Sequence, residues 1–222
     1  TVTGIFVKTS QRKDNIMKLQ VAIDRVSVER ATQIVRALDG RADIIEVGTS
    51  LTKEFGVQAL SPILNAAAGT AVLGDIKTCD EGKYEFDLGF ECGFDYLTVM
   101  GSSSLGTLEA CAASAKEHGG TMMIDLLECD EQRIERISGF RDAVYCLHTS
   151  VDSGVVADPV AQVRAFKERF PQIGHIAIAG GIKRPQLGEL SKEGIDIVIM
   201  GSAITKADDI TEACEACRKE MQ

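Results

Sequence analysis

The chain has 222 residues, enough for one large domain whose core needs neither disulfides nor a structural metal. Its net charge of −9 and its low aromatic content, 5% with no Trp, argue against nucleic acid as a partner and against a base-stacking surface. The seven cysteines follow no framework spacing and no apolar run reaches membrane-spanning length, so we expect a cytoplasmic protein with reduced thiols and no membrane contact.

Regular patterning begins only at Met17. We therefore expect residues 1–16 to be an N-terminal extension, either native or left over from cloning, with Met17 as a candidate for the natural start. Residues 17–222 are expected to form a single catalytic domain.

From Lys18 onward, short apolar runs rich in β-branched residues alternate with stretches of helical periodicity. Eight strands are predicted, at Lys18–Asp24, Ala42–Val47, Ala71–Lys77, Tyr96–Met100, Thr121–Leu126, Ala143–His148, His175–Ala179 and Ile195–Met200. Helices are predicted between them at Val28–Leu38, Tyr84–Cys92, Leu105–Glu117, Pro159–Arg169 and Asp208–Lys219. Continuously apolar strands in strand–helix order are typical of parallel α/β architecture, and eight units predict a closed (β/α)8 TIM barrel.

The structural alternative is an open, doubly wound sheet. Its usual sign is a G-x-G-x-x-G turn after the first strand, whereas here that strand ends in Ile23-Asp24-Arg25-Val26. The closed barrel is therefore favoured.

Polar residues at the carboxyl ends of the strands are the candidates for an active site, because barrel enzymes place their chemistry there. They are Asp24, Glu46, Asp75, Lys77 with Asp80 just beyond it, Asp125 and His148. Asp75 and Lys77 are two positions apart on a strand, so both are expected to point into the barrel mouth within hydrogen-bonding range. A buried lysine between carboxylates stays protonated and can donate to a developing oxyanion, although a purely structural ion pair is the alternative.

The predicted cavity has four carboxylates, from Asp24, Glu46, Asp75 and Asp125, against a single lysine. Such crowding is costly unless a cation is present, and oxygen ligands favour Mg²⁺. We expect Glu46 and Asp75 to be direct ligands with Asp24 close by. The alternative for Asp24 is a cap on the helix that follows it.

His148 is the only histidine at the carboxyl end of a predicted strand and is the default proton-transfer residue, the alternative being a satisfied core group. The pairs Gly180-Gly181 and Gly201-Ser202 close strands seven and eight, where backbone N–H groups commonly hold a phosphate. Glycine also marks any tight turn, so each pair alone is weak evidence.

These residues lie in stretches with a recognisable resemblance: Leu19-Gln20-Val21-Ala22-Ile23-Asp24, Asp43-Ile44-Ile45-Glu46-Val47-Gly48-Thr49, Asp75-x-Lys77-x-x-Asp80-x-Gly82, Ala179-Gly180-Gly181-Ile182 and Gly201-Ser202-Ala203-Ile204. Together they resemble the orotidine-5'-phosphate decarboxylase suprafamily, in particular its 3-hexulose-6-phosphate synthase and 3-keto-L-gulonate-6-phosphate decarboxylase branch. The likeness runs from Met17 to the C-terminus. The Asp-x-Lys-x-x-Asp motif marks the suprafamily, and the Asp-Ile-Ile-Glu-Val-Gly stretch is the more specific sign of the branch.

The resemblance implies a homodimer of barrels with shared active sites, in which Asp80 reaches into the partner's site. It also implies Mg²⁺ on Glu46 and Asp75, an enediolate assisted by Lys77, proton traffic through His148, and a phosphorylated pentulose or hexulose held at the glycine-ended strands. Orotidine-phosphate decarboxylation itself is disfavoured, because those metal-free enzymes are expected to carry lysine where this chain has Glu46.

Within the branch, the decarboxylases resemble one another in having Glu at the position of Asp125 and Arg at the positions of Val151 and Ser202. This chain has none of the three, which favours a synthase that joins formaldehyde to D-ribulose 5-phosphate. The synthases usually have glutamine or glutamate at the positions of Ser153 and Gly154, so the decarboxylase activity or a related phosphosugar specificity remains the alternative.

Two further hypotheses are disfavoured. A ribulose-phosphate 3-epimerase would require metal-binding histidines where Glu46 and Asp75 stand. A non-catalytic phosphosugar-binding barrel would keep the glycines but need not keep the cluster of acids around Lys77.

Overall fold

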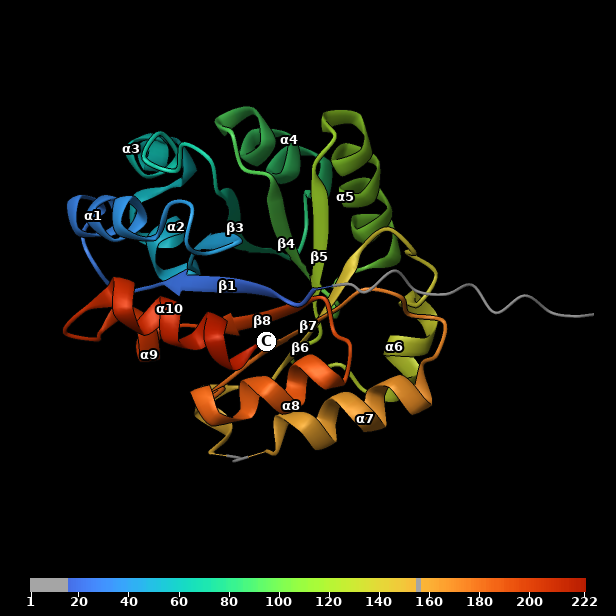
Figure 1. The fold of residues 1–222 in the computed structure, drawn as a ribbon. Helices are drawn as coiled ribbons and strands as arrows, with labels where there is room; N and C mark the ends of the chain where they lie inside the picture. Colours follow the sequence, from blue (N-terminus) through green and yellow to red (C-terminus); the bar gives the residue numbers. More distant parts are fainter. Residues whose placement is uncertain (1–15, 155–156) are drawn as a thin grey trace, which may run out of the picture.

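The computed structural model describes residues 16–154 and 157–222, and they form a closed barrel of eight parallel strands. Each strand pairs with its neighbours in sequence, and β1 pairs with β8 to close the ring (Figure 1). The strands are Lys18–Ile23 (β1), Ile44–Val47 (β2), Ala71–Thr78 (β3), Tyr96–Met100 (β4), Thr121–Asp125 (β5), Val144–His148 (β6), Ile176–Ala179 (β7) and Ile197–Met200 (β8). The (β/α)8 TIM barrel predicted from the sequence is confirmed, and the open sheet is not formed.

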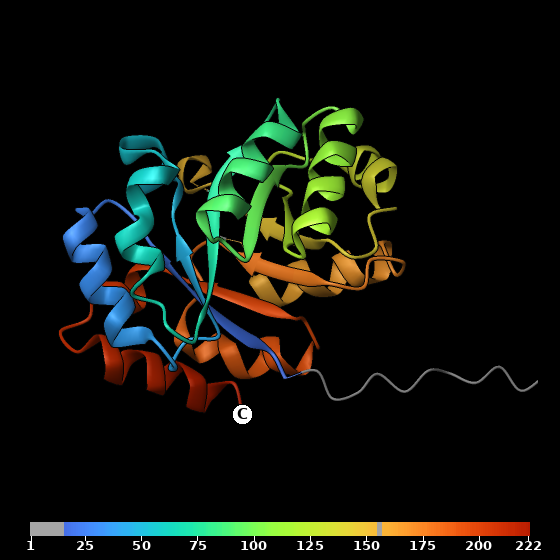
Figure 2. The same ribbon diagram turned by 90° about the horizontal axis from the view of Figure 1, so that it is seen from above.

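Helices surround the barrel, as the two perpendicular views show (Figures 1 and 2). They are Val28–Leu38 (α1), Thr49–Phe55 (α2), Ser61–Leu64 (α3), Gly82–Cys92 (α4), Leu105–His118 (α5), Glu131–Ile137 (α6), Pro159–Arg169 (α7), Leu187–Lys192 (α8), Ser202–Thr205 (α9) and Ile210–Glu220 (α10). Short 3-10 turns lie at Val57–Leu60 (η1), Val151–Ser153 (η2) and Arg184–Gln186 (η3).

Bounds of the longer elements follow the sequence pattern closely. β4, α1 and α7 have the predicted ends, and the other strands differ by one or two residues at an end. Five helices of four to seven residues, α2, α3, α6, α8 and α9, were not predicted. Two turns or fewer give too few repeats for a helical period to stand out.

The core has two layers on either side of the strands. The larger cluster lies between the barrel and its helices and includes Leu19, Val21 and Ile23 of β1. The smaller one lies inside the barrel and consists of Ile44, Leu73, Met123, Val144, Cys146, Ala177 and Ile197. Because successive side chains of a strand face opposite sides, the strands are buried on both faces, which explains their unbroken apolar runs.

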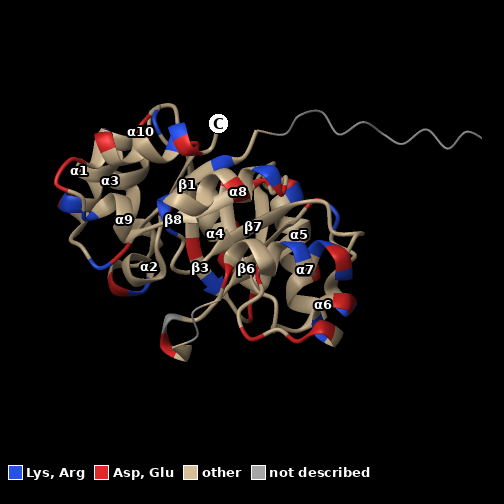
Figure 3. Cartoon of the chain, turned by 60° about the horizontal axis from the view of Figure 1, so that its bottom comes forward, with Lys and Arg blue, Asp and Glu red and all other residues tan. Residues whose placement is uncertain are grey.

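Several helices begin at a side chain that caps the exposed backbone N–H groups of the first turn. Ser27 accepts from the amide of Arg30 at the start of α1, and Asp130 accepts from that of Arg133 at the start of α6. Acidic and basic residues are interspersed along the outer helices, for example α6 and α10 (Figure 3). The outer surface therefore carries mixed charge around an apolar framework.

Residues 1–15 lie outside the described part of the chain, and so does most of the expected extension. Met17 is buried immediately before β1. Across residues 16–154 and 157–222, no helix has the length and apolar character that a membrane crossing requires.

Candidate active site

The alternation of side chains along four strands places polar groups directly above the apolar interior of the barrel. In each of these strands a residue of the inner core is followed two positions later by a polar residue at the carboxyl end. The pairs are Ile44 and Glu46 on β2, Leu73 and Asp75 on β3, Met123 and Asp125 on β5, and Cys146 and His148 on β6. Each of these strands thus contributes a core residue and, two positions later, a residue of the site.

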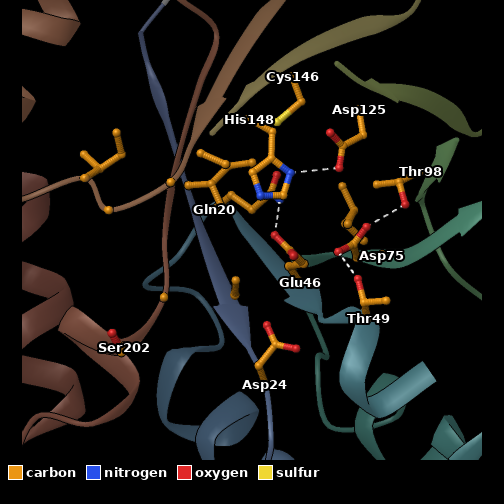
Figure 4. Close-up of a pocket in the computed structure, with 18 of the residues that line it drawn as sticks. Gln20, Asp24, Glu46, Thr49, Asp75, Thr98, Asp125, Cys146, His148 and Ser202 are labelled. Carbon is orange, nitrogen blue, oxygen red and sulfur yellow. Dashed lines mark hydrogen bonds and ion pairs between the residues drawn. The ribbon is translucent and has the colours of Figure 1, made fainter. Parts of the chain in front are cut away.

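These polar residues line a cavity of about 650 Å³ at the carboxyl ends of the strands. Figure 4 shows Glu46, Asp75, Asp125 and His148 converging on its centre. The wall formed by β7, β8 and the loops after them contributes the predicted phosphate residues Gly180, Gly181, Gly201 and Ser202. Asp24 and Lys77 also line this cavity, so apart from Asp80 every predicted site residue borders it.

Lys77 is the centre of the charged cluster. Its Nζ lies 3.0 and 2.9 Å from the two carboxylate oxygens of Asp75 and 2.9 Å from Oδ2 of Asp125. The expected contact between Asp75 and Lys77 is therefore present. The regular strand geometry that we used to predict it is not, because β3 is irregular between Gly74 and Thr78 and Lys77 has a φ of 48°.

Two opposing effects set the pKa values in this cluster: the burial of each group and the charges of its neighbours. Burial alone would lower the pKa of Lys77, but the carboxylates of Asp75 and Asp125 outweigh it and hold the lysine pKa above its usual range. Burial likewise would raise the pKa of Asp125, but the hydrogen bond from His148 and the charge of Lys77 bring it down to about 2. Lys77 and Asp125 are therefore both charged at neutral pH.

His148 is oriented by the same carboxylate. Its Nδ1 lies 2.9 Å from Oδ2 of Asp125, the oxygen that also contacts Lys77. Since Asp125 is an ionised acceptor, Nδ1 carries a proton, and Nε2 is the nitrogen left for exchange with a ligand. Oδ1 of Asp125 accepts from the backbone amide of Leu127 at 2.9 Å, which fixes the carboxylate.

Glu46 is buried and lies beside Asp75. Gln20 Nε2 donates to Glu46 Oε2 at 2.6 Å, whereas Gln20 Oε1 is buried without a partner among the described residues. Burial and then the charge of Asp75 raise the pKa of Glu46 to about 8. A cation between the two carboxylates would remove this conflict.

The donor set suits a hard cation that keeps part of its own coordination sphere. Within the described ranges, His, Cys, Asp and Glu side chains form no group of three or more that could hold a metal ion. Two carboxylates, from Glu46 and Asp75, fit Mg²⁺, which usually retains several waters and takes other oxygens from its substrate.

Asp24 does not cap the helix that follows it, since Ser27 caps α1. Instead its Oδ1 accepts from Ser50 Oγ at 2.7 Å and from the Ser50 backbone amide, in the first turn of α2, at 3.2 Å. A side chain at Gly48 would overlap the Asp24 carboxylate, with a Cβ only 2.3 Å from Oδ1. The glycine of the Glu-Val-Gly stretch thus makes room for Asp24.

Asp80 and the pair Gly180-Gly181 stand apart from this cluster. Asp80 is exposed and does not border the cavity of its own chain. Gly180 and Gly181 have φ values of 105° and 67°, a region that only glycine adopts without strain, and a Cβ at Gly180 would lie 3.0 Å from the carbonyl oxygen of Thr149. This loop therefore requires glycine for its turn.

Besides Gln20, sequence reasoning missed four polar contributors. Thr49 and Thr98 donate to Oδ2 and Oδ1 of Asp75 at 2.5 and 2.7 Å, and Lys183 and Lys206 line the cavity next to the glycine-ended strands. Thr98 had a visible signal, being a polar residue in the middle of a buried strand. The lysines had none, because their loops carry no periodic pattern.

Comparisons with known proteins show what this chain is similar to. A model of the "Orotidine 5'-phosphate decarboxylase / HUMPS family" matches residues 17–217. The curated 3-hexulose-6-phosphate synthase of Bacillus subtilis is 29% identical over 205 residues, which is 91% of this chain and 98% of that protein. That of Staphylococcus epidermidis strain ATCC 12228 is 29% identical over 93% of this chain and 99% of its own length.

Solved structures extend the likeness to three dimensions. The 3-hexulose-6-phosphate synthase of Salmonella typhimurium superposes with a TM-score of 0.85 at 30% identity, covering 92% of this chain and 98% of its own. The KGPDC of Streptococcus mutans has a TM-score of 0.81 at 18% identity, over 93% and 97% of the two chains, which shows the shared fold alone.

Proposed function

Because this chain belongs to the orotidine 5'-phosphate decarboxylase / HUMPS family, we propose that it is a phosphosugar carbon–carbon lyase of the 3-hexulose-6-phosphate synthase type. It would join formaldehyde to D-ribulose 5-phosphate to give D-arabino-hex-3-ulose 6-phosphate. The observation that carries the proposal is the cluster in which Lys77 bridges Asp75 and Asp125 while His148 contacts the same Asp125 oxygen. A protein that only bound sugars would have no use for so costly a cluster.

We propose that the reaction passes through a 1,2-enediolate of the sugar. Removal of a proton from C1 of ribulose 5-phosphate gives the enediolate, whose C1 then attacks the formaldehyde carbon, and the new alkoxide takes up a proton. Mg²⁺ held by Glu46 and Asp75 would supply positive charge that stabilises two adjacent sugar oxygens.

Lys77 and His148 would have the other two roles, hydrogen bonding to the developing negative charge and proton transfer. The Lys77 ammonium stays charged between its carboxylates, so it can donate a hydrogen bond to an oxygen that becomes negative. His148 has Nδ1 occupied by Asp125 and can therefore accept and return a proton through Nε2. Asp125 serves both residues from one oxygen, which keeps the lysine and the imidazole in a fixed relation.

The phosphate would lie at the wall of the cavity formed after β7 and β8. Gly180, Gly181 and Gly201 allow close approach of backbone N–H groups there, and Lys183 and Lys206 line the same part of the cavity. Two ammonium groups beside a glycine turn suit a dianion, even though the chain as a whole is acidic. This arrangement supports a phosphorylated sugar as the substrate class.

The test is a pair of assays on the purified protein with Mg²⁺. One follows loss of formaldehyde in the presence of D-ribulose 5-phosphate, and the other follows CO₂ release from 3-keto-L-gulonate 6-phosphate. We expect formaldehyde loss to dominate and EDTA to abolish it. Dominant CO₂ release would replace the proposal by a decarboxylase, and silence in both assays would overturn it.

A further inference from the structure

β3 departs from regular pairing at the residues that carry Asp75 and Lys77. Residues 75–77 of β3 lie opposite the single residue Thr98 of β4, since the flanking pairs are Gly74 with Leu97 and Thr78 with Val99. Extra residues in one strand form a bulge, which redirects side chains and leaves backbone groups without their ladder partners. Something other than the ladder must hold this bulge in place.

The bulge includes a strained backbone. Lys77 has a φ of 48°, in the left-handed region that non-glycine residues seldom occupy. Its backbone N–H donates to Oγ1 of Thr98 at 2.9 Å instead of to a carbonyl of β4. A buried N–H without a partner is costly, so this bond stabilises the unusual conformation of Lys77.

The same hydroxyl reaches the carboxylate of Asp75. Thr98 Oγ1 donates to Asp75 Oδ1 at 2.7 Å, and Thr98 is only 4% exposed. Because the Lys77 N–H can only donate, Thr98 Oγ1 must accept from it, which leaves its single hydrogen for Asp75. One hydroxyl thus joins the backbone of the lysine to the side chain of the aspartate (Figure 4 shows the bond to Asp75).

We propose that Thr98 is a positioning residue, whose hydroxyl holds the β3 bulge so that the Lys77 ammonium and the Asp75 carboxylate meet in reactive geometry. Thr49 is not equivalent: its hydroxyl, on α2, donates to Asp75, whereas the Lys77 backbone N–H donates to Thr98. The catalytic part of this inference rests on the proposed function, while its structural part does not.

The decisive comparison is between Thr98→Ser and Thr98→Ala. Both lose the methyl group, and only serine keeps the hydroxyl. We expect Thr98→Ala to lower kcat by on the order of 100-fold with little change in KM for the sugar phosphate, because a misplaced catalytic group costs rate more than binding. Thr98→Ser should retain most of the wild-type kcat.

A second measurement reports on the bond without any turnover. Hydrogen exchange of the Lys77 backbone amide, followed by NMR, should become faster by about tenfold or more in Thr98→Ala and stay protected in Thr98→Ser. Thr98→Val, which keeps the side-chain volume, provides the same comparison if Thr98→Ala folds poorly. If the wild type were inactive on every phosphosugar tried, this exchange result would still test the structural part.

The matched control is Thr32, a buried threonine of α1 whose hydroxyl donates to the Val28 carbonyl away from the cavity. Thr32→Ser and Thr32→Ala should leave kcat and the exchange of the Lys77 amide unchanged. Equal kcat in Thr98→Ser and Thr98→Ala, whether both high or both low, would overturn the positioning role, and so would unchanged exchange in Thr98→Ala.

Discussion

The two carboxylate oxygens of Asp125 accept three hydrogen bonds, which explains why this side chain is both ionised and held in place. Lys77 and His148 both reach Oδ2, and the Leu127 amide occupies Oδ1. Its pKa of about 2 means that it remains ionised in the whole range where the protein is expected to work. At the residue scale, Asp125 therefore sets the orientation of both proposed proton-handling groups.

Removal of the Lys77 ammonium should affect rate far more than folding. We expect Lys77→Ala to lower kcat by about 10²- to 10⁴-fold, since the variant loses a positioned donor, while its circular dichroism spectrum stays native. The control is Lys83→Ala, which removes an exposed lysine that also contacts two carboxylates, Asp87 and Glu117, and should keep full rate. A Lys77→Ala variant with most of its turnover would refute the catalytic role.

Glu46 should make the metal-free protein less stable at alkaline pH. Its pKa of about 8 in the folded state exceeds the unfolded value of about 4.3, so the folded state binds more protons between these limits and the free energy of unfolding falls as pH rises through that window. We expect Glu46→Gln to melt at a higher temperature than the wild type at pH 8.5 in EDTA, with the difference shrinking at pH 5. A difference that did not depend on pH would contradict this explanation.

At the scale of elements, the site depends on where the strands end and on how the next segments of the chain pack against those ends. Asp24 directly follows β1 but is held by the first turn of α2, a helix from the next β/α unit. The β2–α2 connection approaches so closely that a Cβ at position 48 would overlap the Asp24 carboxylate, which would have to move. Neighbouring units therefore position each other's site residues.

Substitution of this glycine tests the junction. Gly48→Ala should push the Asp24 carboxylate away, because the new Cβ would lie 2.3 Å from its Oδ1, and lower kcat/KM by about 10- to 100-fold. Gly139→Ala is the matched control, since a Cβ there meets nothing within 4 Å. Wild-type kcat/KM in Gly48→Ala would show that Asp24 does not need its observed position.

At the scale of the whole molecule, one chain leaves Asp80 outside its own cavity. Asp80 is exposed, although it is only three residues beyond Lys77 and belongs to the same Asp-x-Lys-x-x-Asp motif. We propose a homodimer in which Asp80 completes the partner's site. The exposed position in a single chain is compatible with this role, because an interface would cover it.

Hybrid dimers provide the test. If Asp80 acts in trans, Lys77→Ala and Asp80→Asn homodimers should each be nearly inactive, and an equal mixture allowed to exchange subunits should regain about a quarter of wild-type activity. Half of the dimers are then hybrids, and each hybrid has one intact site. No recovery after verified subunit exchange would place Asp80 in its own chain's site, and an active Asp80→Asn homodimer would place it outside catalysis.

The sequence by itself determined the barrel and the ring of polar residues at its mouth. Largely apolar strands need cover on both faces. The change from an apolar to an acidic residue, from Leu73 to Asp75 or from Met123 to Asp125, can be read from the sequence because side chains two positions apart on a strand face the same side. Five short helices escaped prediction because their stability comes from packing and not from a repeated pattern.

Only the tertiary structure decided how these groups meet. The bulge of β3 depends on Thr98 in another strand, the place of Asp24 depends on α2, and the sharing of one Asp125 oxygen by Lys77 and His148 depends on three strands together. Such contacts join residues 21 to 48 positions apart, where no periodicity links them. Hydrogen-bond geometry and burial, which arise when the barrel closes, fix them instead.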